Sequence, residues 1–287
     1  MEKQYILKDA KSFEPIHIFE CGQCFRWNKQ EDGSYTGIFK NNVINVKKEN
    51  NNIIFSGICE GDIKEICTEY FDLKTDYEGI KRKLSGIDDY LKNSINYGQG
   101  IRILKQDLWE TLISFIISAN NNIPRIKLII ERISKQYGKK VEYLGKAYYT
   151  FPTAEELSKA SVEDLRKLGL GFRDKRVYET TQKIKQGEID LNKIAQIEDT
   201  NKIREMLETL PGVGPKVADC ILLFGLKRFE VFPIDVWVRR VMNDLYIKNE
   251  DETKVNKREI EELAKTKYAN LAGIAQQYLF YWRRETA

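Results

Sequence analysis

The chain has 287 residues, of which 42% are hydrophobic and 11% aromatic, and its formal net charge is +4. This length and apolar content exclude a disordered protein and allow a sizeable core divided into two or three subdomains. The small net charge does not by itself indicate a polyanionic partner, and no apolar run approaches the roughly 20 residues that a membrane-spanning helix needs.

The cysteine pattern favours a reducing compartment. Cys21 and Cys24 have the spacing of a redox or metal-binding pair, but no second pair accompanies them and His17 is the only histidine. We therefore predict structural cysteines, no metal site and no cofactor. The odd total of five cysteines, with no recognisable secretory segment, leads us to expect a cytoplasmic protein, nucleoid-associated in a prokaryote.

Residues 23–56 have the pattern of β-strands. The segments 34–40, 42–47 and 52–55 are short and rich in β-branched or aromatic residues. Asp32-Gly33 is a strong hairpin signal, and Asn41-Asn42 is expected to form the next turn.

Helical periodicity replaces this pattern after residue 60. Thr75–Glu78 and Thr153–Glu156 have the sequence of capping boxes, and residues 107–119 and 123–137 form an apolar helical pair. The predicted fold class is therefore α+β. An N-terminal antiparallel β-sheet domain, residues 1–100, precedes a mostly α-helical region, residues 101–287.

One helical segment is strongly basic. Residues 125–185 contain 15 Lys and Arg against 8 Asp and Glu, which suits a phosphate backbone. The alternative interpretation is a solvated helical surface.

A hairpin between two helical patterns is the most informative feature. The helical pattern of residues 200–209 ends at Leu210–Lys216, which reads Leu-Pro-Gly-Val-Gly-Pro-Lys, and a second helical pattern follows. Glycine allows close approach of the backbone to another molecule, and the start of the second helix presents unpaired N–H groups and a positive dipole end. A phosphate is the natural occupant. Lys216 and the later Asp235 add an amine and a carboxylate beside a bound nucleic-acid backbone.

Four segments, in order along the chain, carry a resemblance. They are Gly22–Trp27, Ser118–Arg125, the hairpin with the sequence that follows it, and Gly273–Phe280. On these residues the chain resembles the helix-hairpin-helix (HhH-GPD) DNA glycosylase superfamily, and its 8-oxoguanine DNA glycosylases in particular. The resemblance implies a monomeric base-excision-repair enzyme, with a TBP-like twisted sheet in the first domain and two helical subdomains in the second.

The implied activity is that of a bifunctional DNA glycosylase and AP lyase. A lysine at the position of Lys216 marks the members that expel the base with an amine, form a Schiff base and nick the strand. Asp235 is implied as the second catalytic residue, and it is also expected to cap the helix that follows it. The alternative role for Lys216 is a surface contact with phosphate.

The resemblance also implies a pocket for the extruded base. Cys220 and Phe280 would lie against its two faces, Gln276 would bind its pyrimidine edge, and the Gly22 carbonyl would accept the hydrogen that oxidation places on N7. Trp237 stands where vertebrate members have a histidine and forms the wall beside Asp235. Without the resemblance, Cys220 and Phe280 would be assigned to the core and Gly22 to the start of a strand.

Further residues are implied to bind duplex DNA containing 8-oxoguanine opposite cytosine. Asn120 would fill the hole that the flipped base leaves, and Arg125 and Arg173 would bind the estranged cytosine. Phe172 would be the intercalating wedge, where vertebrate members have tyrosine. The hairpin residues expected at the DNA are Gly212, Val213, Gly214 and Val217.

Two alternatives remain open from the sequence. A non-catalytic helix-hairpin-helix module would need the hairpin but would have no use for Lys216, Asp235 and a base pocket together. A related glycosylase could act on another damaged base.

Overall fold

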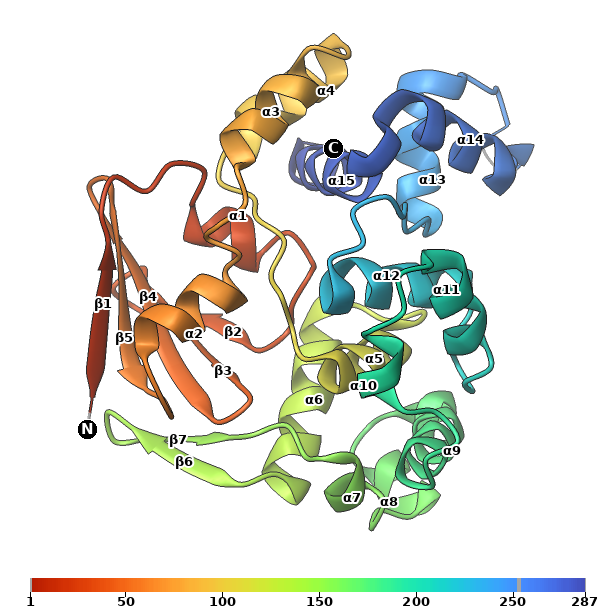
Figure 1. Ribbon diagram of the computed structural model, residues 1–287. Coiled ribbons are helices and arrows are strands. Elements are labelled where there is room, and N and C mark those ends of the chain that lie inside the picture. Colours follow the sequence, from red (N-terminus) through yellow and green to blue (C-terminus); the bar gives the residue numbers. More distant parts are fainter. Residues whose placement is uncertain (1, 252–253, 287) are drawn as a thin grey trace.

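The computed structural model describes residues 2–251 and 254–286, with a sheet-containing N-terminal part beside a larger helical body (Figure 1). The sheet is antiparallel, with the spatial order β1-β5-β4-β3-β2. Its strands are β1 (Lys3–Leu7), β2 (Trp27–Lys29), β3 (Tyr35–Phe39), β4 (Asn42–Glu49) and β5 (Asn52–Ile58).

The three strands predicted from 34–40, 42–47 and 52–55 are confirmed, whereas β1 was not predicted. The turn predicted at Asn41-Asn42 is wrong by one residue. Lys40 adopts the left-handed conformation with φ +51°, and Asn42 already pairs with Phe39 at the start of β4. The two asparagines are both good turn residues, so composition alone does not fix which of them ends the turn.

An aromatic core anchors the sheet. Trp27 is 1% exposed, stacks on Phe19 with ring centroids 4.2 Å apart, and donates from its indole nitrogen to the Tyr70 hydroxyl at 2.9 Å. Gly37 pairs directly with Trp27, and a Cβ at Gly37 would lie 2.4 Å from the indole. The motif that contains Trp27 is therefore fixed to the sheet.

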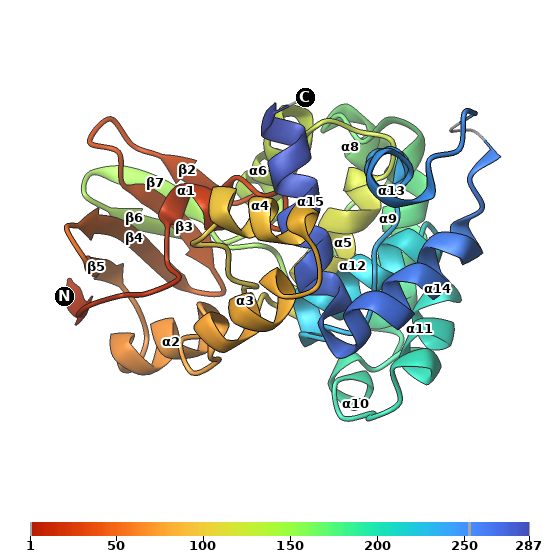
Figure 2. The ribbon, with the colours of Figure 1, turned by 90° about the horizontal axis from the view of Figure 1, so that it is seen from above.

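Four helices complete the first hundred residues: α1 (Pro15–Phe19), α2 (Ile63–Tyr70), α3 (Tyr77–Ser85) and α4 (Asp89–Tyr97). The predicted capping box at Thr75–Glu78 is wrong. Asp76 is the N-cap of α3 and accepts from the Gly79 N–H at 2.9 Å, while the Thr75 hydroxyl bonds to Asp72. Leu84 and Leu91, from α3 and α4, are buried in the core of the helical body, where α4 packs on α15 (Figure 2). The division at residue 100 stays a prediction.

The helical body centres on the antiparallel pair α5 and α12. Its helices are α5 (Leu108–Ser118), α6 (Ile123–Tyr137), α7 (Ala154–Leu157), α8 (Val162–Lys167), α9 (Asp174–Lys185), α10 (Leu191–Ile194), α11 (Thr200–Glu208), α12 (Pro215–Leu226), α13 (Val236–Met242), α14 (Lys257–Tyr268) and α15 (Ala272–Thr286), with the shorter turns η1 (Gly171–Arg173), η2 (Asn243–Ile247) and η4 (Ala269–Leu271). Asp107 and Asn122 cap α5 and α6, and the predicted capping box at Thr153 is confirmed. None of the helices in the described residues has the length and apolar character that crossing a bilayer requires.

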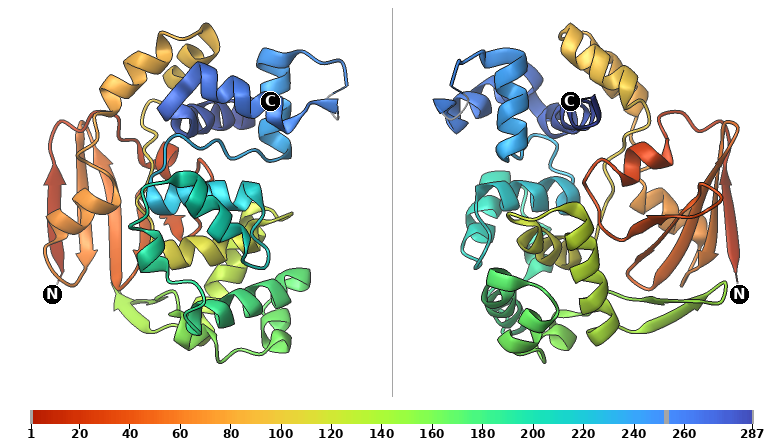
Figure 3. Two further views of the ribbon diagram at one scale, coloured as in Figure 1. Left: turned by 45° about the vertical axis from the view of Figure 1, so that its right-hand side comes forward. Right: turned by 180° about the vertical axis from the view of Figure 1, so that it is seen from behind.

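A β-hairpin interrupts the helical body. Strands β6 (Lys140–Tyr143) and β7 (Lys146–Tyr149) extend from the end of α6 towards the N-terminal sheet (Figure 3). Tyr143 packs there with Ile38 and Val43 in a small buried cluster. The sequence reading of this stretch as helical surface missed this contact between the two parts of the chain.

Candidate active site

The hairpin between α11 and α12 has the predicted form. Gly212 has φ +88°, and a Cβ on it would lie 3.0 Å from side chains of Ile116 and Arg176, so only glycine fits. Gly214 is the N-cap of α12, makes no side-chain capping bond, and is followed by Pro215. The first N–H groups of a helix have no acceptor within it, so the start of α12 can receive an anion. Val213 and Val217 are each 6% exposed, and Val217 also lines the cleft described next. Their contact with DNA stays a prediction.

Lys216 and Asp235 line the same cleft, which has a volume of about 810 Å³. Lys216 lies in the first turn of α12, and Asp235 is the N-cap of α13, where its carboxylate accepts from the Val238 N–H at 2.7 Å. The expected capping role of Asp235 is therefore confirmed. The cap fixes the position of the Asp235 carboxylate at the wall of the cleft. Asp235 is the one acidic residue among the described residues that line this cleft.

Lys216 and Cys220 share one face of α12, four residues apart. The Lys216 amine lies 5.4 Å from the centre of the Phe115 ring. Burial raises the pKa of the Cys220 thiol to about 11, and the adjacent Lys216 opposes that rise. Cys220 is thus a neutral thiol at physiological pH, suited to an apolar contact.

A left-handed turn at one end of the cleft presents Asn120, with φ +57°. Arg173 holds this turn. Its guanidinium donates to the carbonyls of Ala119 and Asn120, both at 2.7 Å, and to that of Leu170 at 3.3 Å. Arg173 is 2% exposed, so its observed role is to position Asn120, and the contact with cytosine stays a prediction.

Arg125 and Phe172 are close to this turn. Arg125 lines the cleft and donates to the Gly169 carbonyl at 3.3 Å. Phe172 is 57% exposed, and the guanidinium groups of Arg173 and Arg176 lie 4.2 and 5.3 Å from its ring centre. An exposed aromatic ring is suited to insertion between stacked bases, and the arginines beside it are suited to contact the neighbouring phosphates.

Most of the residues predicted to bind the base lie outside this cleft. Gly22 has φ +87°, and a Cβ on it would lie 3.5 Å from the Phe280 ring and from a guanidinium nitrogen of Arg284. Gln276 is 5% exposed and accepts from the Gln277 amide at 2.7 Å. Segments from near the two ends of the chain, the loop around Gly22 and helix α15, thus lie side by side. Gly22, Cys220, Gln276 and Phe280 do not line the 810 Å³ cleft, whereas Trp237 does.

Sequence reasoning missed Arg239 and Lys257, which also line the cleft. Arg239 lies in the last turn of α13 and Lys257 is the first residue of α14. Basic residues are common on exposed helix turns, so the sequence does not separate a functional cation from a solvated one. Lys257 follows the N-cap Asn256 of α14.

The comparisons with known proteins agree with this geometry. Residues 5–112 match the family described as 8-oxoguanine DNA glycosylase, N-terminal domain, and residues 113–275 match the HhH-GPD superfamily of base excision DNA repair proteins. The chain belongs to the HhH-GPD superfamily. It is 34% identical to the N-glycosylase/DNA lyase of Saccharomyces cerevisiae in an alignment of 279 positions that covers 88% of this chain and 72% of the yeast protein.

Two solved structures of this superfamily are similar over nearly the whole chain. One is described as MBOgg1 in complex with a low-affinity DNA ligand: it has 47% identity and a TM-score of 0.94, over 99% of this chain and 96% of the other. The second is the Clostridium acetobutylicum 8-oxoguanine glycosylase/lyase in complex with double-stranded DNA containing cytosine opposite 8-oxoguanine. It has 43% identity and a TM-score of 0.93, over 100% of this chain and 98% of that one.

The cysteines of this HhH-GPD chain lie in the core. All five are buried and none forms a disulfide. Burial raises the pKa of Cys21 to about 11 and that of Cys24 well above its ordinary value. Within the described residues, no group of three or more His, Cys, Asp or Glu side chains is arranged to hold a metal ion.

Proposed function

We propose that the protein is a bifunctional DNA glycosylase and AP lyase that removes 8-oxoguanine from duplex DNA. The observation that carries this proposal is the shared cleft, in which the Lys216 amine and the Asp235 carboxylate lie beside a hairpin suited to phosphate. A DNA-binding module would need only the hairpin. The similarity to an N-glycosylase/DNA lyase and to an 8-oxoguanine glycosylase/lyase supports the same substrate and activity.

The chemistry follows from the positions of these two residues. The nitrogen lone pair of Lys216 attacks C1′ of the flipped nucleotide, and the bond from C1′ to the base breaks, so the base leaves with the electron pair and takes up a proton. The Asp235 carboxylate is rigidly held by its cap and stabilises the positive charge that develops at C1′.

The resulting amine adduct opens the sugar ring and becomes a Schiff base between Lys216 and C1′. This imine acidifies the C2′ hydrogen. Loss of that proton expels the 3′ phosphate oxygen and cuts the strand, and water then releases Lys216. The hairpin and the start of α12 hold the strand by its phosphates while these steps take place.

We further propose that Cys220 and Phe280 enclose the base and that Gly22 and Gln276 bind its edges. A Cβ on Gly22 would lie 3.5 Å from the Phe280 ring, and Gln276 is buried one turn before Phe280 on α15, which supports this assignment. Asn120, Arg125, Phe172 and Arg173 would occupy the gap and meet the opposite cytosine. We also propose that the protein acts as a monomer in the cytoplasm, with no metal or other cofactor.

A panel of duplexes tests the proposed function. Each duplex carries one base (8-oxoguanine, an alkylated purine, an oxidised pyrimidine or undamaged guanine) opposite cytosine, and single-turnover excision and strand cleavage are measured. The expected result is fastest excision of 8-oxoguanine, with cleavage of the same strand. Preferred excision of another lesion would assign a different substrate, and binding without excision of any base would indicate a non-catalytic module.

A further inference from the structure

The proposed base site is built from two parts of the chain that are far apart in the sequence. Gly22 lies in the loop between α1 and β2, whereas Lys216 and Cys220 lie on α12. A carbonyl that distinguishes one hydrogen on a base must be held within a few tenths of an ångström relative to the nucleophile. The structure therefore needs a rigid link between the Gly22 loop and α12.

Gln23, the residue after Gly22, forms the first half of that link. It is fully buried, and its side-chain amide makes hydrogen bonds to the backbone of the extended segment 102–104. Its side-chain oxygen accepts from the Leu104 N–H at 2.8 Å, and its amide nitrogen donates to the Arg102 carbonyl at 2.7 Å. The same nitrogen donates to the Ile18 carbonyl of α1 at 2.9 Å, so the loop is also held to the helix that precedes it.

Gln106 forms the second half. Its side-chain amide donates to the Gln23 backbone carbonyl at 2.7 Å, and its own N–H donates to the Phe224 carbonyl of α12 at 3.1 Å. Phe224 is one helical turn after Cys220. One residue thus connects the peptide next to Gly22 directly to the helix that carries the nucleophile.

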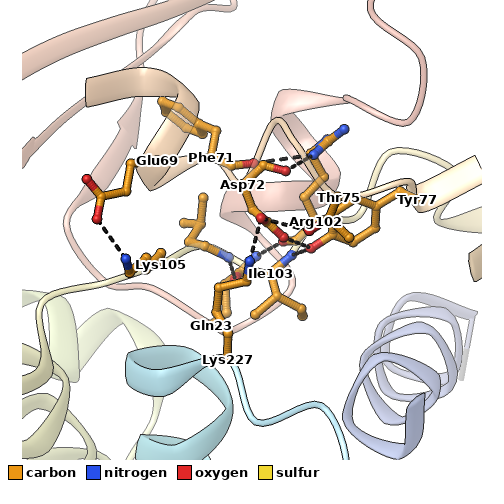
Figure 4. Close-up of polar contacts among 11 residues, drawn as sticks. Gln23, Glu69, Phe71, Asp72, Thr75, Tyr77, Arg102, Ile103, Lys105 and Lys227 are labelled. Carbon is orange, nitrogen blue, oxygen red and sulfur yellow. Dashed lines mark hydrogen bonds and ion pairs between the residues drawn. The ribbon is translucent and has the colours of Figure 1, made fainter. Parts of the chain in front are cut away.

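Neighbouring contacts make this link stiff. Phe25 packs edge-on against Phe115 at 5.5 Å, and Phe115 stacks on Phe224 at 5.4 Å. Figure 4 shows the polar side of the same junction. Arg102 donates to the Asp72 carbonyl at 2.6 Å, and Lys227, at the end of α12, forms an ion pair with the Asp72 carboxylate.

We propose that Gln23 and Gln106 are positioning residues for base recognition: they fix the Gly22 carbonyl relative to Lys216 and Cys220. This inference rests on the proposed function, because it assumes that Gly22 binds the base. It separates two activities of one site. Excision of 8-oxoguanine needs the base seated against Gly22, whereas cleavage at an existing abasic site uses Lys216 and the hairpin but has no base to seat.

The informative variant is Gln106→Met, which keeps the shape of the side chain and removes its donor. Gln106 is only half-buried, whereas replacing the fully buried Gln23 would leave the Arg102 carbonyl and the Leu104 N–H unpaired and would destabilise the fold. Gln99→Met is the matched control, because the Gln99 amide donates at 3.2 Å to Asn96 and not to the Gly22 loop.

The experiment compares single-turnover excision of 8-oxoguanine with cleavage of a preformed abasic site, for the unmodified protein and both variants. Gln106→Met should slow excision by roughly tenfold, the scale of one lost hydrogen bond, and leave abasic-site cleavage within about twofold. Gln99→Met should change neither rate.

Unchanged excision by Gln106→Met, or an equal loss of both activities, would overturn the inference. Either result would leave the proposed function standing as long as the unmodified protein excises 8-oxoguanine. Failure of the unmodified protein to do so would instead overturn the proposed function.

Discussion

Asp235 caps a helix and also lines the cleft in which we propose that catalysis takes place. Its carboxylate caps α13 through the Val238 N–H, and the same group lines the cleft with Lys216. Arg173 shows the same combination, because it was expected at the opposite base and is found holding the Asn120 turn. At such positions, only a substitution that preserves the structural role measures the chemical one.

Asp235→Asn meets that condition. Asparagine caps helices as well as aspartate does, so the melting temperature should stay within a few degrees of the unmodified protein. Loss of the negative charge at C1′ should slow single-turnover excision by roughly 10²–10³-fold, with little change in affinity for lesion DNA. Near-normal excision would show that Asp235 is only a cap.

We expect opposite-base preference to depend most on Arg125. We expect excision opposite cytosine to be fastest, with other partners tolerated better than in relatives that carry tyrosine at Phe172. Arg125→Ala should narrow the gap between cytosine and adenine partners, because a good bidentate contact contributes about 1–3 kcal/mol of discrimination.

Arg132→Ala is the control for this prediction. Arg132 lies on the same helix and donates to the Leu168 carbonyl at 3.3 Å, much as Arg125 donates to Gly169, but it does not line the cleft. Single-turnover rates on duplexes with each opposite base test both variants. Equal rates in the unmodified protein, or the same effect from both substitutions, would contradict the assignment of Arg125.

At the scale of elements, the hairpin between α11 and α12 depends on one backbone conformation. Gly212→Ala places a Cβ at φ +88° and within 3.0 Å of Ile116 and Arg176, so it should lower the free energy of unfolding by about 1–3 kcal/mol. The shifted hairpin should also bind duplex DNA more weakly. Thermal unfolding and equilibrium binding measure the two effects.

Gly187→Ala is the control, because it separates the strain of a positive φ from the crowding of the added Cβ. Gly187 has φ +75°, but a Cβ there would meet nothing within 4 Å. This control should lose less stability than Gly212→Ala and should bind DNA normally. The same loss of DNA affinity in both variants would show that the hairpin geometry is not specific to binding.

Elements with strong local signals could be predicted from the sequence. The helices predicted over 107–119 and 123–137 and the capping box at Thr153 depend on contacts within a few residues, so the local sequence determines them. Gly212 in the hairpin is likewise determined locally, because the turn requires its backbone conformation. By contrast, β1 and the β6–β7 hairpin are placed by partners distant in the chain, such as β5 and Ile38. The capping box at Thr75 failed because Asp76, one residue later, competes for the same role.

At the scale of the whole molecule, the site joins segments from both ends of the chain. The approach of the Phe280 ring to the Gly22 backbone has no local signal, so only the resemblance could place these two residues together. The hydrogen bonds through Gln23 and Gln106 were not predicted either, because a buried glutamine has many possible partners. By contrast, Lys216 is part of the hairpin motif and Asp235 follows it in the sequence, so both could be identified from the motif.

Binding to undamaged duplex is also a property of the whole surface. The basic segment 125–185 and the hairpin should release counterions on binding, so log K should fall with log salt concentration by roughly 0.9 per phosphate contacted. Equilibrium binding at several salt concentrations measures this slope. An affinity independent of salt would contradict a phosphate-binding surface.

Borohydride trapping on a duplex with 8-oxoguanine opposite cytosine, followed by peptide mapping of the adduct, tests the central claim most directly. The account predicts a covalent adduct on Lys216 and its loss in Lys216→Gln, which should still bind lesion DNA. Lys257→Gln, which changes another lysine of the same cleft, should still trap. An adduct that persists in Lys216→Gln, or that maps to another amine, would contradict the assignment of Lys216 as the nucleophile.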